Sequence, residues 1–122
     1  MSDNNSPIVS VIVPLYNAEK YIENCVNCLE TQSFTLFEAI FVNDHSTDES
    51  ARLLKAATGH DNRFVVASNG GVKGVSAARN LGISLSRGGL IYFLDVDDQI
   101  QPQALQLMVE RKGEHDLICT TY

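Results

Sequence analysis

Short apolar runs alternate along this chain with longer stretches in which apolar residues recur every three or four positions. Runs rich in β-branched and aromatic residues predict strands at 8–14, 37–43, 64–67 and 90–94, with 116–120 as a candidate fifth strand. Helical spacing predicts helices over about 18–31, around 51–57, from a glycine-rich loop to about 87, and from 102 to 111 or 112. Strand and helix therefore alternate throughout.

This alternation predicts an α/β domain with an open, mostly parallel sheet and helices on both faces, because the connections are too short for anything but right-handed crossovers. The run 90–94 is apolar throughout, which is typical of a strand buried on both faces. Such sheets bind ligands beyond the carboxyl ends of their strands. Tyr16, Asp44 and the acids of 95–98 all follow strand ends, so we expect one crevice to collect them.

The connections argue against two common nucleotide-binding patterns. Pro14 ends the first strand, since proline cannot donate to a strand ladder, and the turn after it has no glycine, unlike the dinucleotide fingerprint. The glycine-rich segment 68–80 has no Gly-Lys-Ser/Thr at the spacing of a Walker loop. Ser46 and Glu49 stand at capping-box spacing and predict the start of the second helix.

The composition is that of a small globular domain with an acidic balance. The chain has 122 residues, 44% of them hydrophobic, so we expect a folded domain over 7–122 after a disordered leader at 1–6. A net charge of -6 argues against nucleic acid or an anionic membrane surface as a partner. An acidic protein that binds phosphate needs a local device, either a metal ion or backbone N–H groups at a helix start.

The sequence also bears on compartment. No apolar run has the length of a membrane span, and 1–6 is polar without a signal-peptide core, so cytoplasmic residence is expected. Three cysteines, an odd number, fit a reducing compartment better than a disulfide framework. Cys25 and Cys28 fall inside a predicted helix without a second pair to complete a zinc site, so we expect them to pack in the core.

Three carboxylates follow the fourth predicted strand, at Asp95, Asp97 and Asp98. If the chain stays extended there, Asp95 and Asp97 point to the same side, because side chains alternate along a strand. Converging carboxylates repel each other unless a cation lies between them, and Mg²⁺ or Mn²⁺ prefers such oxygen ligands. The alternative is that these acids cap the next helix and face water.

Three further side chains suit a nucleotide or sugar, and each has a structural alternative. Tyr16 offers a flat face to a base or sugar ring, or packs as a boundary tyrosine on a neighbouring helix. Asp44 can accept a hydrogen bond from a base N–H, which distinguishes uracil from cytosine at N3, or it is an acid favoured at a helix start. Arg79 can meet a diphosphate, or pair with one of the acids.

Four segments, 10–17, 42–48, 78–82 and 93–98, resemble glycosyltransferase family 2 in their order and spacing. The resemblance runs from Pro7 to about Leu107. It implies the Rossmann-like GT-A fold and an enzyme that moves a sugar from a nucleotide diphosphate donor to an acceptor with inversion. The donor it implies is a UDP-sugar, and the acceptor is a saccharide or lipid-linked molecule such as a polysaccharide or glycolipid.

Carried over by position, the resemblance assigns roles to the candidate residues. Donor contacts fall to Pro14, Tyr16, Asp44, Arg79 and Asp95, and metal ligation to Asp95 and Asp97. In this scheme Tyr16 stacks on the base, Asp44 binds its N3–H, and Asp95 lies near the ribose or the metal. Asp97 holds Mn²⁺ or Mg²⁺ on the diphosphate, where the metal neutralises charge on the leaving UDP.

The chain departs from the family in ways that limit what it is expected to do. Asn43 precedes Asp44 where members often have two acids, and Val96 replaces a small polar residue, but neither change removes a proposed ligand. The family's general base and acceptor pocket lie past this segment, so no catalytic residue is assigned. We therefore expect the nucleotide-binding half of a transferase, a truncated GT-A domain over 7–122, that binds donor but turns over little alone.

Two further expectations and two alternatives stay open. Removing half a domain exposes a sheet edge, which favours self-association, and the full-length protein is expected in the cytoplasm or peripheral to the membrane. A signalling receiver also places acids around Mg²⁺, but it needs an acidic pair where 14–17 stands. A non-catalytic nucleotide-binding module is the other alternative.

Overall fold

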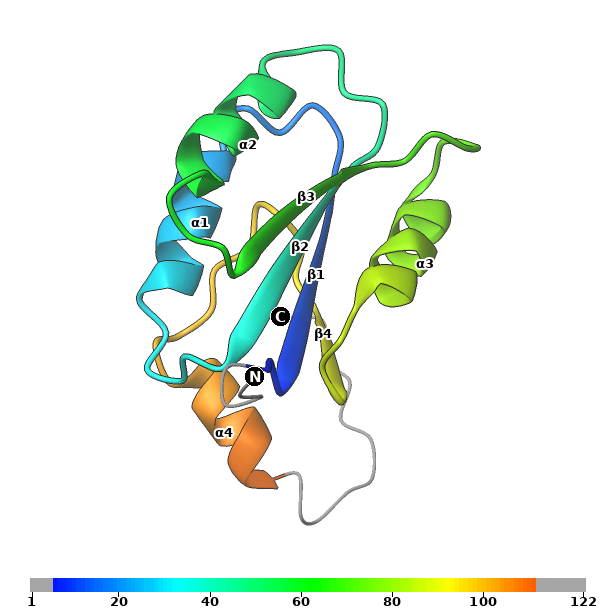
Figure 1. The fold of residues 1–122 in the computed structure, drawn as a ribbon. Helices are drawn as coiled ribbons and strands as arrows, with labels where there is room; N and C mark the ends of the chain where they lie inside the picture. Colours follow the sequence, from blue (N-terminus) through cyan, green and yellow to red (C-terminus); the bar gives the residue numbers. More distant parts are fainter. Residues whose placement is uncertain (1–5, 112–122) are drawn as a thin grey trace.

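The computed structural model describes residues 6–111, in which four strands alternate with four helices (Figure 1). The elements are β1 Val9–Leu15, α1 Ile22–Glu30, β2 Phe37–Asn43, α2 Ser50–Thr58, β3 Phe64–Ser68, α3 Val75–Leu85, β4 Leu90–Phe93 and α4 Ala104–Glu110. The four strands form one parallel sheet in the order β3-β2-β1-β4. Most of the predicted leader and the candidate strand at 116–120 lie outside the described residues.

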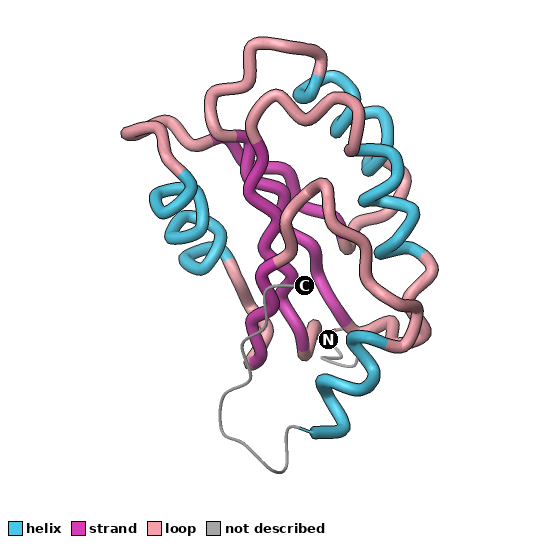
Figure 2. Tube along the Cα trace, turned by 180° about the vertical axis from the view of Figure 1, so that it is seen from behind, coloured by secondary structure: helices cyan, strands magenta, loops and turns pink. Residues whose placement is uncertain are grey.

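Helices cover both faces of the sheet, as the alternation predicts. Helices α1, α2 and α4 lie on one face and α3 lies on the other, as the front and back views show (Figures 1 and 2). Val11 and Phe41 of the sheet pack with Leu29, Leu54 and Leu105 of the three helices in the larger core cluster. The smaller cluster joins the sheet to α3 through Ile12, Ile40, Val42 and Ala78. No helix of the described residues is long and apolar enough to cross a membrane.

The approach of α3 to the sheet depends on one glycine. Gly82 faces β1 so closely that a Cβ atom in its place would collide with the side chain of Ile12. Because that contact is closer than real Cβ atoms adopt, any larger residue would push α3 away from the sheet. The sequence motif Ala78–Gly82 is therefore, in part, a packing feature.

The predicted capping box does not form. Ser46 Oγ accepts a hydrogen bond from the backbone N–H of Asn17 at 2.9 Å, and α2 begins only at Ser50, whose N–H donates to Asp48 Oδ1 at 2.9 Å. Helix α1 also starts later than predicted, at Ile22. In both cases, polar groups that the local pattern places at the start of a helix instead form hydrogen bonds between the loop after β1 and the loop after β2.

Strand β4 is not buried on both faces, contrary to the prediction from its apolar run. Leu90 and Tyr92 are buried against the larger core, but Ile91 and Phe93 are only partly covered on the α3 side. The reason is its position, because β4 is an edge strand that pairs with β1 alone among the described strands.

Candidate functional site

The carboxyl ends of β1, β2 and β4 surround two adjoining hollows. The larger, about 260 Å³, is lined by Pro14, Leu15, Tyr16, Asn17, Ala18, Tyr21, Asp95, Val96 and Asp97. The smaller, about 110 Å³, shares four of these residues and adds Asp44 and Val75. The structure thus brings Pro14, Tyr16, Asp44, Asp95 and Asp97 to one crevice, as the strand-end argument predicts.

The three acids meet through a turn rather than an extended strand. The Asp98 N–H donates to the Asp95 carbonyl at 3.0 Å, which closes a turn directly after β4. One carboxylate oxygen from each of Asp95, Asp97 and Asp98 lies within 4.8 Å of the others. The premise of strand alternation is therefore wrong, although the convergence it predicts is found, and Asp98 joins the cluster.

The donor set of this acidic cluster, Asp95, Asp97 and Asp98, fits a divalent cation. Three carboxylates at this separation supply the hard oxygen ligands that Mg²⁺ and Mn²⁺ prefer. Within residues 6–111, the one ion pair of the cluster joins Arg79 Nη2 to Asp95 Oδ1 at 3.7 Å. A single cation against three acids leaves negative charge that a metal ion would balance.

Arg79 lies beside the acidic cluster, and its side chain is only partly satisfied by its neighbours in residues 6–111. Its guanidinium carbon is 5.5 Å from the centre of the Phe93 ring, and its buried Nε finds no hydrogen-bond acceptor among the described residues. An orphaned buried donor is unusual in proteins and costs stability. The pairing with Asp95 agrees with the structural alternative for Arg79, which lines neither of the two hollows.

The loop that follows the cluster is tied to α1. Cys28 Sγ accepts a hydrogen bond from the Ile100 N–H and donates to the Ile100 carbonyl, both at 3.1 Å. Gln32, which is 5% exposed, donates to the Gln101 carbonyl at 2.8 Å and accepts from the Leu105 N–H at 3.2 Å. Sequence reasoning missed Gln32, because no local pattern announces a contact with a segment so far along the chain.

The paired cysteines of α1 contribute packing, as predicted, but one also bonds. Burial raises the pKa of the Cys25 thiol to about 12, with a smaller contribution from Cys28, so Cys25 is a neutral core residue. Cys28 is partly buried and makes the two bonds to Ile100 described above.

Asp44 is buried and holds the glycine-rich segment 69–74. Its Oδ1 accepts from Asn69 Nδ2 and its Oδ2 accepts from the Gly74 N–H, both at 2.9 Å, and it is 5% exposed. The helix-start alternative for Asp44 does not apply, because α2 begins only at Ser50. The carboxylate keeps lone pairs that face the smaller hollow.

Tyr16 lies at the mouth of the crevice with 46% of its surface exposed. The Nζ atom of Lys73, from the same glycine-rich segment, lies 3.5 Å from the centre of the Tyr16 ring. The Tyr16 ring therefore contacts a lysine from a loop, a neighbour that the boundary-tyrosine alternative does not include. Sequence reasoning missed Lys73, because nothing in its neighbours points to Tyr16.

Hydrogen bonds hold the loops after β1 and β2 in place beside this crevice. Asn17, in the left-handed region with φ 46°, accepts hydrogen bonds at Oδ1 from the N–H groups of Thr47 (2.8 Å) and Asp48 (3.3 Å). His45 also has a positive φ, 66°, and its Nε2 lies 2.9 Å from the Gly71 carbonyl. Positive φ at residues other than glycine is uncommon and clusters at functional sites.

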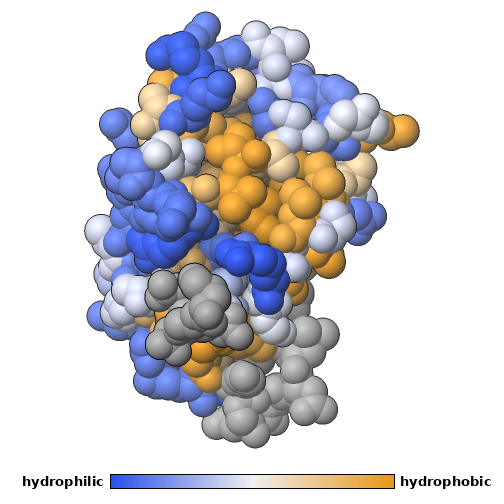
Figure 3. Space-filling view, viewed as in Figure 1, coloured by the Kyte–Doolittle hydropathy of each residue, from blue (hydrophilic) through white to orange (hydrophobic). Residues whose placement is uncertain are grey.

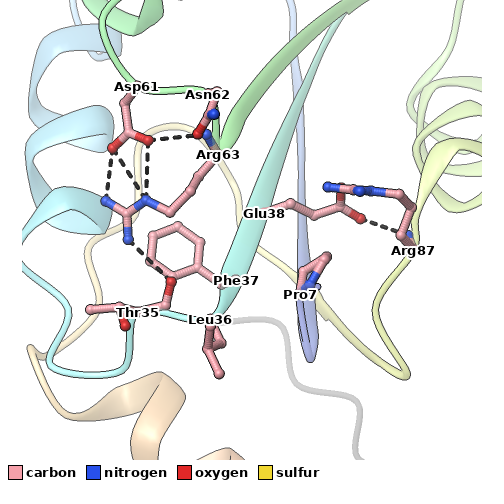
Figure 4. Close-up of a pocket in the computed structure, with 9 residues that line it drawn as sticks. All are labelled: Pro7, Thr35, Leu36, Phe37, Glu38, Asp61, Asn62, Arg63 and Arg87. Carbon is pink, nitrogen blue, oxygen red and sulfur yellow. Dashed lines mark hydrogen bonds and ion pairs between the residues drawn. The ribbon is translucent and has the colours of Figure 1, made fainter. Parts of the chain in front are cut away.

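A larger cavity than either hollow lies at the opposite end of the sheet and is a weaker candidate. Its volume is about 540 Å³, and its lining is Pro7, Thr35, Leu36, Phe37, Glu38, Asp61, Asn62, Arg63 and Arg87 (Figure 4). Its charges pair with one another, Arg63 with Asp61 at 2.8 Å and Arg87 with Glu38 at 3.3 Å. A charged ligand there would have to break bonds that the fold already makes.

Comparison with known proteins shows the family to which the chain belongs. The family model described as glycosyl transferase family 2 matches residues 10–122. The chain belongs to this family. Among its family relatives, EpsH of Bacillus subtilis (strain 168) is 39% identical over 118 residues, which cover 96% of this chain and 34% of EpsH. The glycosyltransferase GlyG of Streptococcus pneumoniae serotype 4 is 34% identical over 91% of this chain and 37% of GlyG.

Solved structures show the same fold. S. aureus TarS 1-349 in complex with UDP-GlcNAc superposes with a TM-score of 0.73 at 33% identity, over 88% of this chain and 32% of that one. The mannosyltransferase PcManGT from Pyrobaculum calidifontis, in complex with GDP-Man and Mn²⁺, gives 0.81 at 21% identity over 88% and 33%, a likeness of fold alone. This family 2 chain thus has the α/β GT-A fold and spans about one third of the length of these relatives.

Proposed function

We propose that this chain is the donor-binding part of a glycosyltransferase that uses a divalent metal and a UDP-sugar. The observation that carries the proposal is the acidic cluster, three carboxylates within 4.8 Å of one another, beside hollows lined by Tyr16 and Asp44. Family membership supports sugar transfer, and the likeness to TarS, which was solved with UDP and with UDP-GlcNAc, supports a UDP-sugar as the donor.

Each donor residue has a part that its position can perform. The Tyr16 ring stacks on the base, and Pro14 lines the same hollow. Asp44 accepts a hydrogen bond from the uracil N3–H in addition to its bonds from the glycine-rich segment. Arg79, paired with Asp95 at 3.7 Å, offers its guanidinium to the diphosphate. These contacts orient the donor so that its anomeric carbon is presented at the open side of the crevice.

The acidic cluster supplies the metal ligands. Asp97 and Asp95 hold Mn²⁺ or Mg²⁺, with Asp98 as a third oxygen donor, and Asp95 also borders the ribose. When bound, the metal neutralises negative charge on the leaving diphosphate. Arg79, whose Nη2 lies 3.7 Å from Asp95 Oδ1, places a positive charge beside these metal ligands.

Transfer itself needs a group that these residues do not provide. An inverting enzyme requires a carboxylate to take the proton of the acceptor hydroxyl on the face opposite the leaving group. No described acid is assigned to that role, so residues 7–122 bind donor and transfer little by themselves. The acceptor is a saccharide or lipid-linked molecule such as a polysaccharide or glycolipid, and the longer protein works in the cytoplasm or at a membrane surface.

Self-association is part of the proposal for the isolated chain. Apolar side chains gather over the face between β3 and α3 (Figure 3). The exposed apolar residues there and nearby are Val66, Val72, Val75, Ile83 and Leu85. Two copies that cover this surface would remove it from water, so the chain is expected to dimerise as concentration rises. Sedimentation at increasing concentration tests this, and a monomer throughout would contradict it.

A calorimetric titration with UDP, with and without Mn²⁺, tests the function. The wild-type chain is expected to bind UDP more tightly with Mn²⁺ present, and Asp97→Ala is expected to lose that difference. Glu110→Gln, at the end of α4 and away from the crevice, is the matched control for removing one acid. Equal binding with and without Mn²⁺ would contradict metal dependence, and no binding by the folded wild-type chain would contradict donor binding.

A further inference from the structure

Lys73 occupies a position that matters for any base bound to Tyr16. Its ammonium lies 3.5 Å from the centre of the aromatic ring, well inside the range of a cation–π contact. Tyr16 lines both hollows of the crevice, and Asp44 lines the smaller one. A base that bridges Tyr16 and Asp44 competes with the ammonium for the face of the ring.

Hydrogen bonds hold the backbone around Lys73 in place. The lysine side chain is therefore the part of this segment that can change its position. Asn69 Nδ2 donates to both the Asp44 carboxylate and the Val72 carbonyl at 2.9 Å, and Asn69 Oδ1 accepts from the Gly71 N–H at 3.1 Å. Gly74, the next residue after Lys73, donates to Asp44 at 2.9 Å. The segment that carries Lys73 to the Tyr16 ring is therefore hydrogen-bonded to Asp44.

We infer that Lys73 makes the site discriminate between nucleotides and uncharged nucleosides, an inference that rests on the proposed donor site. A nucleoside has to displace the ammonium from Tyr16 and gives nothing in return. A nucleoside diphosphate displaces it too, but offers phosphate oxygens with which the flexible lysine pairs. The same side chain thus opposes uridine and supports UDP.

This exchange predicts two separate changes in Lys73→Ala. Uridine should bind roughly two- to fivefold more tightly, because the competing cation–π contact is gone. The preference for UDP over uridine should fall roughly five- to tenfold, because the phosphate partner is gone as well. A residue that only supports the fold would weaken both ligands together and leave their ratio unchanged.

The experiment compares uridine and UDP binding to the wild-type chain, Lys73→Ala, Lys73→Arg and Lys55→Ala, by titration calorimetry without metal. Lys55, exposed in the last turn of α2, is the control for removing one positive charge. Lys73→Arg should retain most of the preference and Lys55→Ala all of it. Tyr16 ring resonances of the empty protein should shift in Lys73→Ala, which detects the contact without any ligand.

Three results would overturn the inference. An unchanged ratio in a Lys73→Ala chain that still binds UDP would refute the role of Lys73 and leave the donor site standing. Unmoved Tyr16 resonances would refute the contact itself. A wild-type chain that binds neither ligand, both without metal and with Mn²⁺, would refute the donor site and, with it, this role of Lys73.

Discussion

Among the residues that the structure describes, charged side chains are paired within the protein at one end of the sheet and largely unpaired at the other. At the amino ends of the strands Glu38, 2% exposed, accepts hydrogen bonds of 2.6 Å from Ser10 Oγ and from the Arg87 N–H. At the carboxyl ends Asp95 and Asp97 are exposed, and the acidic cluster makes one ion pair within residues 6–111, at 3.7 Å. One end balances its charge inside the protein, and the other leaves negative charge at the surface.

This difference separates stability from function along the same strands. A buried carboxylate that accepts several hydrogen bonds contributes to the folded state, and its loss leaves donors without partners. Exposed acids that repel one another contribute little or oppose folding. Substitutions at the amino ends are therefore expected to change the free energy of unfolding, and those at the carboxyl ends to change binding.

The largest effect on stability is expected from Glu38→Ala. The substitution leaves the Ser10 hydroxyl and the Arg87 N–H without their acceptor and opens a cavity, which should lower the free energy of unfolding by about 2–4 kcal/mol. Urea denaturation measures it. A loss below about 0.5 kcal/mol, the level typical of surface sites, would contradict the contrast between the two ends.

Gln32→Leu is expected to lower the free energy of unfolding by a smaller amount and to weaken metal binding as well. It removes the bonds to the Gln101 carbonyl and the Leu105 N–H, which should cost about 1–3 kcal/mol and loosen the loop after the acidic cluster. Mn²⁺ affinity should fall as well, measured with the protein fully folded. Gln32→Glu keeps the acceptor for Leu105 but sets a carboxylate oxygen against the Gln101 carbonyl in a buried site, so it should lose at least as much stability. Unchanged Mn²⁺ affinity in Gln32→Leu would show that the tie serves only the fold.

Asp98→Ala is the counterpart of Glu38→Ala at the carboxyl end. Stability should change by no more than about 0.5 kcal/mol, or rise slightly, because one of three repelling carboxylates is gone. Mn²⁺ affinity should nevertheless fall severalfold, since one oxygen ligand is lost. Urea denaturation and a Mn²⁺ titration on the same preparation measure the two, and a large loss of stability with full metal affinity would reverse the assignment.

The smallest effect concerns acid. Hydrogen bonds from the Arg63 side chain hold the pKa of Asp61 below its usual value of 3.8, although burial acts against them. The unfolded chain therefore takes up this proton before the folded one does, so the contribution of Asp61 is present at neutral pH and is lost as pH falls below about 4. Asp61→Asn should flatten that part of the stability curve, and an unchanged acid slope would contradict it.

Local patterns predicted the elements better than the contacts between them. The run Phe37–Asn43 was predicted with its observed bounds, because β-branched and aromatic residues fit a central strand. The capping box at Ser46 failed because Asn17, far away in the chain, bonds that hydroxyl. The prediction that 90–94 is buried on both faces was wrong for a similar reason, since an apolar sequence does not reveal that β4 is an edge strand.

The gathering of most candidate residues at one edge of the sheet was predictable, but the contacts that arrange them were not. Tyr16, Asp44 and the acids were found because parallel strands bring their carboxyl ends to one edge. The turn that gathers the acids, the hold of Gln32 on the next loop, and the ammonium of Lys73 on Tyr16 all depend on folded geometry. Each of these joins segments that no short-range spacing relates.

The central claim is that the acidic cluster binds a divalent cation for the nucleotide, and electron paramagnetic resonance of free Mn²⁺ tests it most directly. In the presence of UDP, the wild-type chain should remove close to one equivalent of Mn²⁺ from the free signal beyond what UDP removes alone. Asp95→Asn/Asp97→Asn should remove none beyond that level, while Glu110→Gln behaves as wild type. Equal Mn²⁺ uptake by the double variant and the wild-type chain would contradict the claim.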